Sequence, residues 1–393
     1  MIKRTLQELC LNITDGKHGD CENEENSGYY FISCKDIFDG QINYKNARQI
    51  TKADFEETHK RTMLEVDDIL LTNSGTIGRM AFVTDREATT KTTFQKSVAI
   101  IKPDKQKVLP RYLYYQLQNC VPQFINSSNG SAQKNLLLST MRTFQIEIEE
   151  NREKQEKIAN TLSAYDDLIE NNQKQIKLLE EAAQRLYKEW FVDLRFPGHE
   201  NTKIVDGVPE GWNEKTLSQV ANVIMGQSPK SEFYNSEKKG LPFHQGVGSY
   251  GVRFVVDDIY STSYTRIAEP NSILFSVRAP VGRLNITKNK VVIGRGLAAI
   301  NQTDGCQSYL YYLLKNKFFK DNIVGNGSIF ASVSKDELLN QKFLIPERNL
   351  MMQFEKIVSQ MDKQIENLDS KNKKLIEARD RLLPKLMSGE VEV

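Results

Sequence analysis

The chain has 393 residues, 39% of them hydrophobic and 26% charged, a composition that can build packed cores in two or three domains. No run approaches 18 apolar residues and the start lacks an apolar signal core, so neither a transmembrane helix nor export is predicted. The net charge of +2 excludes a uniformly basic surface but permits local basic patches. Five scattered cysteines without a CxxC pair argue against a disulfide framework or zinc ribbon and favour a reducing, cytoplasmic location.

The first half of the chain predicts a globule followed by a rod. Residues 1–150 alternate strand-like runs at 68–72 and 97–101 with a Tyr-rich helix at 111–119, and Gly, Asn and Ser punctuate the loops. This pattern indicates a mixed α/β domain. Residues 151–195 then predict one long helix.

The second half follows the same order. Residues 196–345 predict another mixed α/β domain, with strands at 271–277 and 297–301 and a helix at 308–316. A second long helix is predicted over 346–393, with Pro346 in its first turn and Ser388-Gly389 at its end.

Both long helices carry an apolar seam whose spacing alternates between four and three residues, as in a coiled coil. The seam residues are Ile158, Leu162, Ile169, Asn172, Ile176, Leu179, Leu186 and Trp190 in the first helix, and Phe354, Met361, Ile365, Leu368, Asn372, Leu375, Leu382 and Leu386 in the second. Antiparallel pairing places Ile158 against Leu386, Trp190 against Phe354, and Asn172 opposite Asn372, where a polar layer fixes the register. A hairpin that only stiffens the chain, or pairing with helices of other chains, is the alternative.

Apolar residues that flank the seam are predicted to be exposed in the isolated chain. They are Leu178, Tyr187, Phe191, Ile376 and Leu383. Their exposure would mean that the rods need partner chains.

The chain repeats itself with a period of about 200 residues, too long for a solenoid. Matching segments occur in the same order in both halves: Thr5-Leu6 with Thr216-Leu217, 68–79 with 272–283, 111–119 with 308–316, Gly130-Ser131 with Gly327-Ser328, 144–146 with 343–345, 156–158 with 355–357, and 169–171 with 365–367. We therefore predict an α+β protein with two similar globules, each followed by its own helix. An antiparallel helix pair would relate the globules by a pseudo-twofold axis, which matches the twofold symmetry of the DNA backbone.

The two long helices carry a set of longer motifs. They are Gln155-Glu-Lys-Ile158, Ile169-Glu-Asn-Asn172, Leu178-Leu-Glu180, Leu186-Tyr-Lys-Glu-Trp-Phe191, Phe354-Glu-Lys-Ile357, Ile365-Glu-Asn367 and Leu382-Leu-Pro-Lys-Leu-Met-Ser-Gly389, joined by Phe196-Pro-Gly198 and Pro209-Glu-Gly-Trp212. These motifs resemble those of type I restriction-modification specificity subunits. The globules resemble target recognition domains through the turns at Gly78-Arg79 and Gly282-Arg283 and the Gly226-Gln-Ser-Pro229 loop. The resemblance covers essentially the whole chain, and its helix motifs are the more specific part.

The resemblance implies a non-catalytic subunit that reads double-stranded DNA. Each globule would read one half of a bipartite target, and the coiled coil would set the spacer and dock two modification (methyltransferase) subunits. S-adenosylmethionine, ATP and Mg would be needed only by partner subunits, which include restriction subunits where these exist.

Catalytic motifs are missing from the sequence. It contains no Asn-Pro-Pro-aromatic loop of adenine methyltransferases, no GxxxxGK[ST] phosphate loop and no GxSxG elbow. The four histidines lack metal-ligand spacing. We therefore expect neither a catalytic residue nor a metal site in this chain.

Loops rich in Gly, Ser, Asn, Gln, Lys and Arg are the candidate DNA contacts, since Lys and Arg neutralise phosphates and Asn, Gln and Arg bond base edges. In the first globule the candidates are Thr14, Gly16, Lys17, His18, Asn73, Ser74, Arg79, Lys91, Thr92, Gln95, Lys96, Asn129, Ser131, Gln133 and Lys134. In the second they are Gln227, Ser228, Lys230, His244, Gln245, Arg278, Arg283, Arg295, Asn326 and Ser328. The alternative for each of these residues is an ordinary solvated turn.

Some candidates keep two interpretations. Arg79 and Arg283 contact phosphate or pair with a carboxylate that holds the turn. The pairs Tyr114-Tyr115 and Tyr311-Tyr312 pack on the sheet or, less in keeping with their mid-helix position, stack on bases.

Two other functions remain open at this point. A coiled-coil adaptor with two protein-binding globules would lack the salt-dependent DNA affinity that phosphate contacts produce. A nuclease built from dispersed carboxylates would show metal-dependent cleavage by the purified chain.

Overall fold

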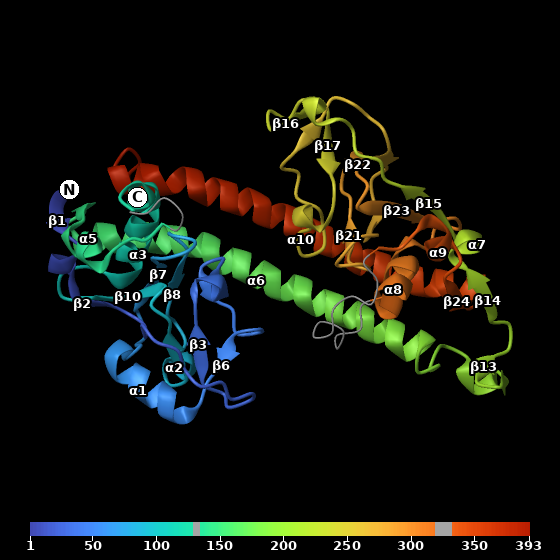
Figure 1. Cartoon of the computed structure of the whole chain (residues 1–393), viewed down its shortest axis with the longest axis horizontal. Coiled ribbons are helices and arrows are strands. Elements are labelled where there is room, and N and C mark those ends of the chain that lie inside the picture. Colours follow the sequence, from blue (N-terminus) through green and yellow to red (C-terminus); the bar gives the residue numbers. More distant parts are fainter. Residues whose placement is uncertain (129–133, 319–331) are drawn as a thin grey trace. The chain divides into compact units, whose positions relative to one another are not determined.

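The computed structural model describes residues 1–128, 134–318 and 332–393. Contacts divide the chain into two compact units: unit 1 comprises Met1–Asn171 and Lys371–Val393, and unit 2 comprises Asn172–Ser370. The two long helices, α6 (Arg152–Phe191) and α10 (Arg348–Ser388), each contribute one half to each unit (Figure 1). Each unit therefore consists of one globule together with the halves of both long helices that pack on it. The predicted segments 1–150, 151–195, 196–345 and 346–393 describe the order of globules and helices along the chain, which is a different division from the two units.

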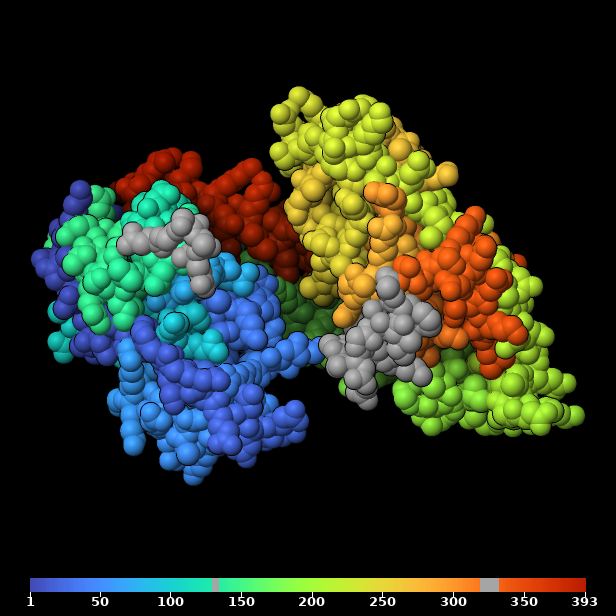
Figure 2. Space-filling model, in the orientation of Figure 1, coloured from blue at the N-terminus to red at the C-terminus, as the bar shows by residue number. Residues whose placement is uncertain are grey.

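Unit 1 is built on a four-stranded antiparallel sheet of order β2-β10-β7-β8, with a three-stranded sheet β6-β3-β9 and the pairs β1-β11 and β4-β5 beside it. Its strands are β1 (Ile2–Thr5), β2 (Cys10–Asp15), β3 (Tyr30–Ile32), β4 (Ile37–Phe38), β5 (Gln41–Ile42), β6 (Arg48–Gln49), β7 (Ile69–Thr72), β8 (Met80–Phe82), β9 (Thr92–Phe94), β10 (Val98–Pro103) and β11 (Gln145–Ile148). Its shorter helices are α1 (Lys52–Thr62), α2 (Arg86–Thr89), α3 (Pro110–Asn119), α4 (Val121–Asn126) and α5 (Leu138–Thr143). The space-filling view shows α1, in light blue, on the surface of this unit (Figure 2).

Unit 2 repeats this plan with a four-stranded sheet of order β15-β23-β20-β21, a five-stranded sheet β16-β18-β17-β22-β19 and the pairs β14-β24 and β12-β13. Its strands are β12 (Ile204–Val205), β13 (Val208–Pro209), β14 (Asn213–Thr216), β15 (Ala221–Met225), β16 (Tyr234–Asn235), β17 (Leu241–His244), β18 (Tyr260–Ser261), β19 (Ile267–Ala268), β20 (Ile273–Ser276), β21 (Leu284–Ile286), β22 (Val291–Ile293), β23 (Leu297–Gln302) and β24 (Lys342–Ile345). Its shorter helices are α7 (Leu217–Val220), α8 (Gln307–Phe318) and α9 (Lys335–Leu339).

The two units share the central part of one topology. The parallel pair β3-β9 of unit 1 corresponds to the parallel pair β17-β22 of unit 2. The edge pairs β1-β11 and β14-β24 also correspond, and Leu6 and Leu217 follow β1 and β14 with equivalent 2.9 Å amide bonds, to the carbonyls of Phe144 and Gln341. The duplication read from the sequence is therefore present in the four-stranded sheet, the parallel strand pair and the edge pair of each unit, whereas the remaining short strands differ.

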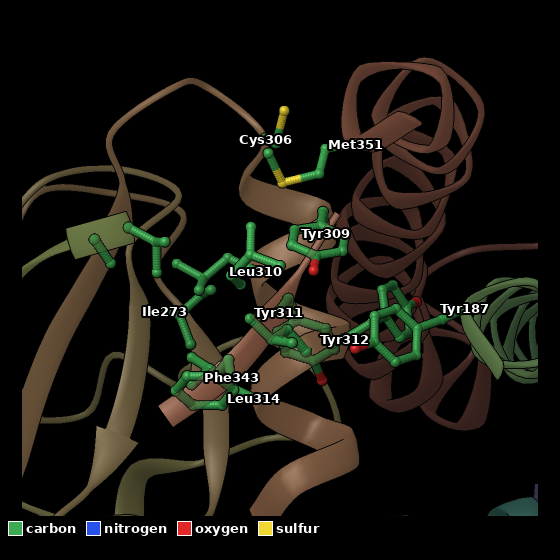
Figure 3. Close-up of a cluster of buried hydrophobic side chains, with 14 of the residues drawn as sticks. Tyr187, Ile273, Cys306, Tyr309, Leu310, Tyr311, Tyr312, Leu314, Phe343 and Met351 are labelled. Atoms are coloured by element: carbon green, nitrogen blue, oxygen red, sulfur yellow. The ribbon is translucent and has the colours of Figure 1, made fainter. Parts of the chain in front are cut away.

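Tyrosines of α3 and α8 form the centre of the two cores. Tyr112 and Tyr115 are fully buried in unit 1, and Tyr309 and Tyr312 are buried in unit 2 beside Tyr187 of α6 (Figure 3). Packing is thus the role of the Tyr114-Tyr115 and Tyr311-Tyr312 pairs, as the sequence favoured.

Within each unit the two long helices pair in antiparallel order. In unit 1, Ile158 and Leu386 share one core cluster and Asp166 pairs with Arg379 at 2.6 Å. In unit 2 the ring centroids of Trp190 and Phe354 lie 6.0 Å apart. All predicted seam residues are buried or half-buried.

The polar seam position in unit 1 is tied to the opposite helix. The Asn372 side chain is buried and donates to the carbonyl of Ile169 at 3.3 Å. The pairing of Asn172 with Asn372 and the pseudo-twofold relation concern both units and stay predictions.

The rod predictions need three corrections. Helix α10 begins at Arg348, so Pro346 precedes it, and Pro384 lies inside its last turns. Tyr187, predicted to be exposed, is 4% exposed because it packs in the core of unit 2. Phe191 and Leu383 are half-buried, whereas Leu178 and Ile376 are exposed as expected. The end at Ser388-Gly389 is confirmed, with Gly389 at φ 76°.

Among the described residues, every helix is too short or too polar to cross a membrane.

Candidate nucleic-acid interface

The ends of several strands of unit 1 meet in one polar rim. Lys17, just after β2, donates its amide to the carbonyl of Phe94 at 2.8 Å, and Lys96 donates to the carbonyl of Lys17 at 3.1 Å. Asn73, after β7, donates to the carbonyl of Ser97 at 3.0 Å. We call this surface, formed by 16–18, 73–74 and 95–97, the rim of unit 1. Two predicted loops and the candidate pair Asn73-Ser74, which are far apart in sequence, thus become neighbours.

Unit 2 builds its rim at the same strand ends, with two equivalent backbone bonds and a third bond that ends on a side-chain hydroxyl. Gln227, after β15, donates its amide to the carbonyl of Ile293 at 2.9 Å, and Arg295 donates to Ser228 Oγ at 3.2 Å. Val277, after β20, donates to the carbonyl of Gly296 at 2.9 Å. The rim of unit 2 therefore consists of 226–228, 277–278 and 294–296, with Gln245 beside it through a 3.1 Å bond from the amide of Gly296.

Close backbone approach explains the glycine that opens each rim. A Cβ atom on Gly16 would lie 1.9 Å from the carbonyl oxygen of Phe94, and one on Gly226 would lie 2.1 Å from that of Gly294. No side chain fits at either position. Gly16 is thus needed for loop packing, which is a different role from the predicted DNA contact.

The two Gly-Arg turns are held by a hydroxyl at the end of the preceding strand. Thr72 Oγ1 accepts the amide of Arg79 at 2.9 Å, and Ser276 Oγ accepts the amide of Arg283 at 2.8 Å. The exposed guanidinium of Arg79 lies 3.5 Å from the carbonyl of Cys34. Backbone and hydroxyl groups hold these turns, so the Arg79 side chain is not needed to close its turn.

Many predicted contact residues present their side chains at the surface. His18, Arg79, Lys91, Lys96, Lys134, Gln227, Lys230, Gln245, Arg278 and Arg295 are exposed, and Lys17, Ser74, Gln95, Ser228 and Arg283 are half-buried.

Several predicted contact residues are buried. Thr92 and His244 are 0% exposed. Thr92 lies in β9, where its hydroxyl bonds with Tyr44 Oη at 3.0 Å. His244 ends β17 and bonds with Ser249 Oγ at 2.9 Å and Asp257 Oδ1 at 3.1 Å. The prediction of DNA contact is wrong for these two side chains, because neither reaches the surface.

Thr14 and Asn73 are also buried, at 8% and 4% exposure. Thr14 lies in β2, whereas Asn73 lines an open pocket described below.

Three predicted cations are engaged by carboxylates. Lys17 pairs with Asp54 at 3.1 Å and with Glu57 at 3.2 Å, and the bond to Asp54 raises the pKa of Lys17 above its usual value. Lys91 pairs with Glu87 at 2.8 Å, and Lys230 lies 4.0 Å from Glu232. Partial neutralisation reduces what these lysines offer to a phosphate.

The remaining candidates Asn129, Ser131, Gln133, Asn326 and Ser328 lie outside the described residues, as do the matching pairs Gly130-Ser131 and Gly327-Ser328.

A pocket of about 640 Å³ opens beside the rim of unit 1. Its lining includes Asp15, His18, Arg61, Asn73 and Lys96. Arg61 did not appear among the sequence candidates because it lies in the last turn of α1, far along the chain from the rim loops. No local signal could have found it, since its partner Asp15 is 46 residues away.

Metal chemistry has no visible centre in the parts of the chain that the structure covers: no three His, Cys, Asp or Glu side chains gather there closely enough to hold an ion.

Two equivalent polar rims, each on an α/β unit that packs on halves of the same long helices, define a class of proteins with duplicated recognition domains. Comparison with known families identifies that class. The type I restriction modification DNA specificity domain matches residues 3–181 and 209–378. The chain belongs to this family, as a type I restriction-modification specificity subunit with two target recognition domains.

Relatives agree over nearly the full length. The chain is 27% identical over 400 residues to the putative type I restriction enzyme MjaX specificity subunit of Methanocaldococcus jannaschii, covering 99% of this chain and 93% of that protein. It is 28% identical over 383 residues to the MjaIX specificity subunit of the same organism, covering 92% of this chain and 87% of that protein. These similarities do not favour the adaptor interpretation.

A solved structure has the same fold. The type I restriction-modification S subunit from M. genitalium superposes with a TM-score of 0.59 over 98% of this chain and 95% of its own, at 19% identity.

Proposed function

We propose that the chain reads a bipartite, asymmetric DNA sequence, one half-site for each unit, and positions partner enzymes on it. The observation that carries this proposal is the duplicated rim, in which equivalent backbone bonds gather polar loops at equivalent strand ends of both units. Exposed cations such as Lys96, Arg278 and Arg295 suit phosphates, and exposed amides such as Gln227 and Gln245 suit base edges.

The helices α6 and α10 are proposed to serve as ruler and dock. Forty residues of α6 span ~60 Å at 1.5 Å per residue, so rod length would set the spacer between half-sites. Apolar side chains remain exposed on the rods, among them Leu178 at 64% and Ile376 at 38%. We propose that two modification subunits cover part of this surface and that restriction subunits join the type I complex.

We assign the catalytic activities of the complex to its modification and restriction subunits. The sequence lacks the methyltransferase loop and the ATP-binding loop, which supports a non-catalytic role. S-adenosylmethionine, ATP and Mg would therefore bind to partner subunits. Because its proposed target is chromosomal DNA, we place the complex in the cytoplasm.

Long-read methylation sequencing of the source genome, with and without this gene, tests the proposal. We expect an adenine-methylated bipartite motif to vanish on deletion and to return when the gene is restored. Should the methylome stay unchanged although the modification subunit is expressed, DNA reading by this chain would be contradicted.

A titration of the chain with its modification subunit against DNA separates the adaptor alternative. DNA reading predicts an affinity that falls steeply as salt rises. An adaptor would show no DNA affinity at any salt concentration.

A further inference from the structure

The Arg61 side chain is bonded to Asp15 and Thr14 on one side and exposed to solvent on the other. Its Nη2 bonds Asp15 Oδ1 at 2.5 Å and its Nε lies 3.5 Å from Thr14 Oγ1. The Asp15 side chain is 7% exposed, whereas that of Arg61 is 50% exposed. A buried carboxylate therefore fixes the guanidinium, while Nη1 takes no part in these bonds and half of the side chain faces solvent.

Both carboxylate oxygens of Asp15 have a partner. Its second oxygen, Oδ2, lies 2.9 Å from His18 Nε2. His18 and Arg61 thus bind the two oxygens of one carboxylate at the end of β2. Two partners on one anchor leave little freedom for the guanidinium plane, which lowers the entropy lost when it binds a ligand.

The pocket wall holds an unused acceptor. Asn73 is 4% exposed and lines the pocket together with Arg61 and Asp15. Within the described ranges, its Oδ1 is buried and has no hydrogen-bond partner. A buried polar atom without a partner costs stability, so this pocket carries one polar group, Asn73 Oδ1, that the fold itself does not satisfy.

We propose that Arg61 reads a guanine in the half-site of unit 1, and that Asp15 is its positioning residue. A guanidinium fork binds O6 and N7 of guanine in bidentate fashion, the pattern that distinguishes G·C in the major groove. Lys96 at the same pocket is exposed and suits the adjoining phosphate. The inference rests on the proposed DNA-reading function and adds the base and the side chain that reads it.

The test compares methylation motifs of the full complex carrying wild-type chain, R61K or R61Q. R61K keeps the charge and removes the fork. We expect discrimination at one G·C position of one half-site to fall about tenfold or more, with the other half-site unchanged. The matched control R86K alters an exposed arginine of α2 outside the pocket, and it should leave every position unchanged.

D15N tests the positioning role, because it removes the charge that fixes Arg61 and nearly preserves shape. We expect relaxation at the same base pair as in R61K, and little further loss in the double variant. A merely structural role would instead weaken all sequences alike.

Three outcomes are distinguishable. No motif in the wild-type complex would contradict the proposed function itself. A wild-type motif that R61K leaves unrelaxed, or relaxes at an A·T position, would overturn the assignment of Arg61 while leaving DNA reading intact.

Discussion

Thr72 and Ser276 each fasten a strand to the Gly-Arg turn that follows it. Both are essentially unexposed, and each hydroxyl also donates within its turn, to the carbonyls of Thr76 and Pro280. Thr72→Val and Ser276→Ala each remove two part-buried hydrogen bonds from the turn, which costs about 1–3 kcal/mol of unfolding free energy in all. Urea unfolding with hydrogen exchange should locate the loss in unit 1 for the first variant and in unit 2 for the second.

The control for these variants is Thr90→Val, whose exposed hydroxyl donates to the carbonyl of Glu87. It should change stability by less than about 0.5 kcal/mol. If Thr72→Val were as mild as this control, the hydroxyl would not be what holds the turn.

Gly78 and Gly282 adopt φ values of 93° and 86°, a region that disfavours any side chain. A Cβ on Gly78 would lie 2.5 Å from Val121 Cγ1, and one on Gly282 would lie 3.0 Å from Phe318 Cβ. Both alanine variants should lose about 1–3 kcal/mol from backbone strain, and Gly78→Ala should lose more because it also overpacks the core. Thermal unfolding of the two variants measures which of them loses more stability.

Gly19→Ala is the neutral control, because the nearest atom to a Cβ at that position would be 3.9 Å away. Equal stability of all three variants would contradict this reasoning.

Predictions about single residues succeed where the property depends on the residue itself or on its neighbours in the sequence. The repeated Gly-Arg pair indicated a tight turn correctly, because a positive φ is a property of the glycine itself. His244 was misplaced because its burial depends on Asp257 and Ser249 coming together in the fold. Arg61 was missed because its anchor Asp15 lies on another element.

At the scale of elements, a buried arginine ties unit 2 to its rod segments. Arg253 is 2% exposed, pairs with Asp362 of α10 at 2.5 Å and donates to Tyr312 Oη of α8 at 3.1 Å. Its guanidinium also lies 4.0 Å from the ring centre of Tyr311. One side chain thus joins the sheet layer, the Tyr-rich helix and the rod.

Arg253→Met should cost about 3–5 kcal/mol, because it removes a guanidinium that is 2% exposed and binds Asp362, Glu180 and Tyr312. In unit 1 the corresponding tie is Arg379 with Asp166, whose side chains are 23% and 22% exposed. Arg379→Met should therefore cost less. Hydrogen exchange in α8 and α3 measures each loss, and the double change Arg253→Met with Asp362→Asn should recover part of it. A larger loss for Arg379→Met would contradict the ranking by burial.

Long periodic elements were the most predictable part of the fold. A seam repeating every three and four residues marks a helix face regardless of context, and its residues are all buried or half-buried. The start of α10 was displaced from Pro346 to Arg348 because a cap depends on few residues. Tyr187 was misjudged because the seam pattern ignores α8, which covers that flank of the rod.

At the scale of the whole molecule, the duplicated architecture was readable because seven matched segments share one order, whereas the pairing of loops into rims was not. The rims depend on sheet order, which brings β2, β10 and β7 together although α1 separates β2 from β7 in sequence. Strand order is a tertiary property, so sequence indicated the candidate loops without showing which of them meet.

Rod length should control the spacer between half-sites. Four residues, about one helical turn, inserted into both α6 and α10 between 171 and 172 and between 370 and 371, lengthen each helix by ~6 Å. At 3.4 Å per base pair, the methylated motif should gain ~2 base pairs of spacer with both half-sites unchanged. Methylation sequencing of the complex measures the spacer length directly.

The same insertion in the exposed turn at Asp206-Gly207 should leave the motif as it is. Insertion into one helix alone should disrupt the pairing of the two long helices and abolish methylation. The proposal connects the distance between the bases that are read to the length of the two helices alone. An unchanged spacer in a complex that still methylates would therefore show that the helices do not set this distance.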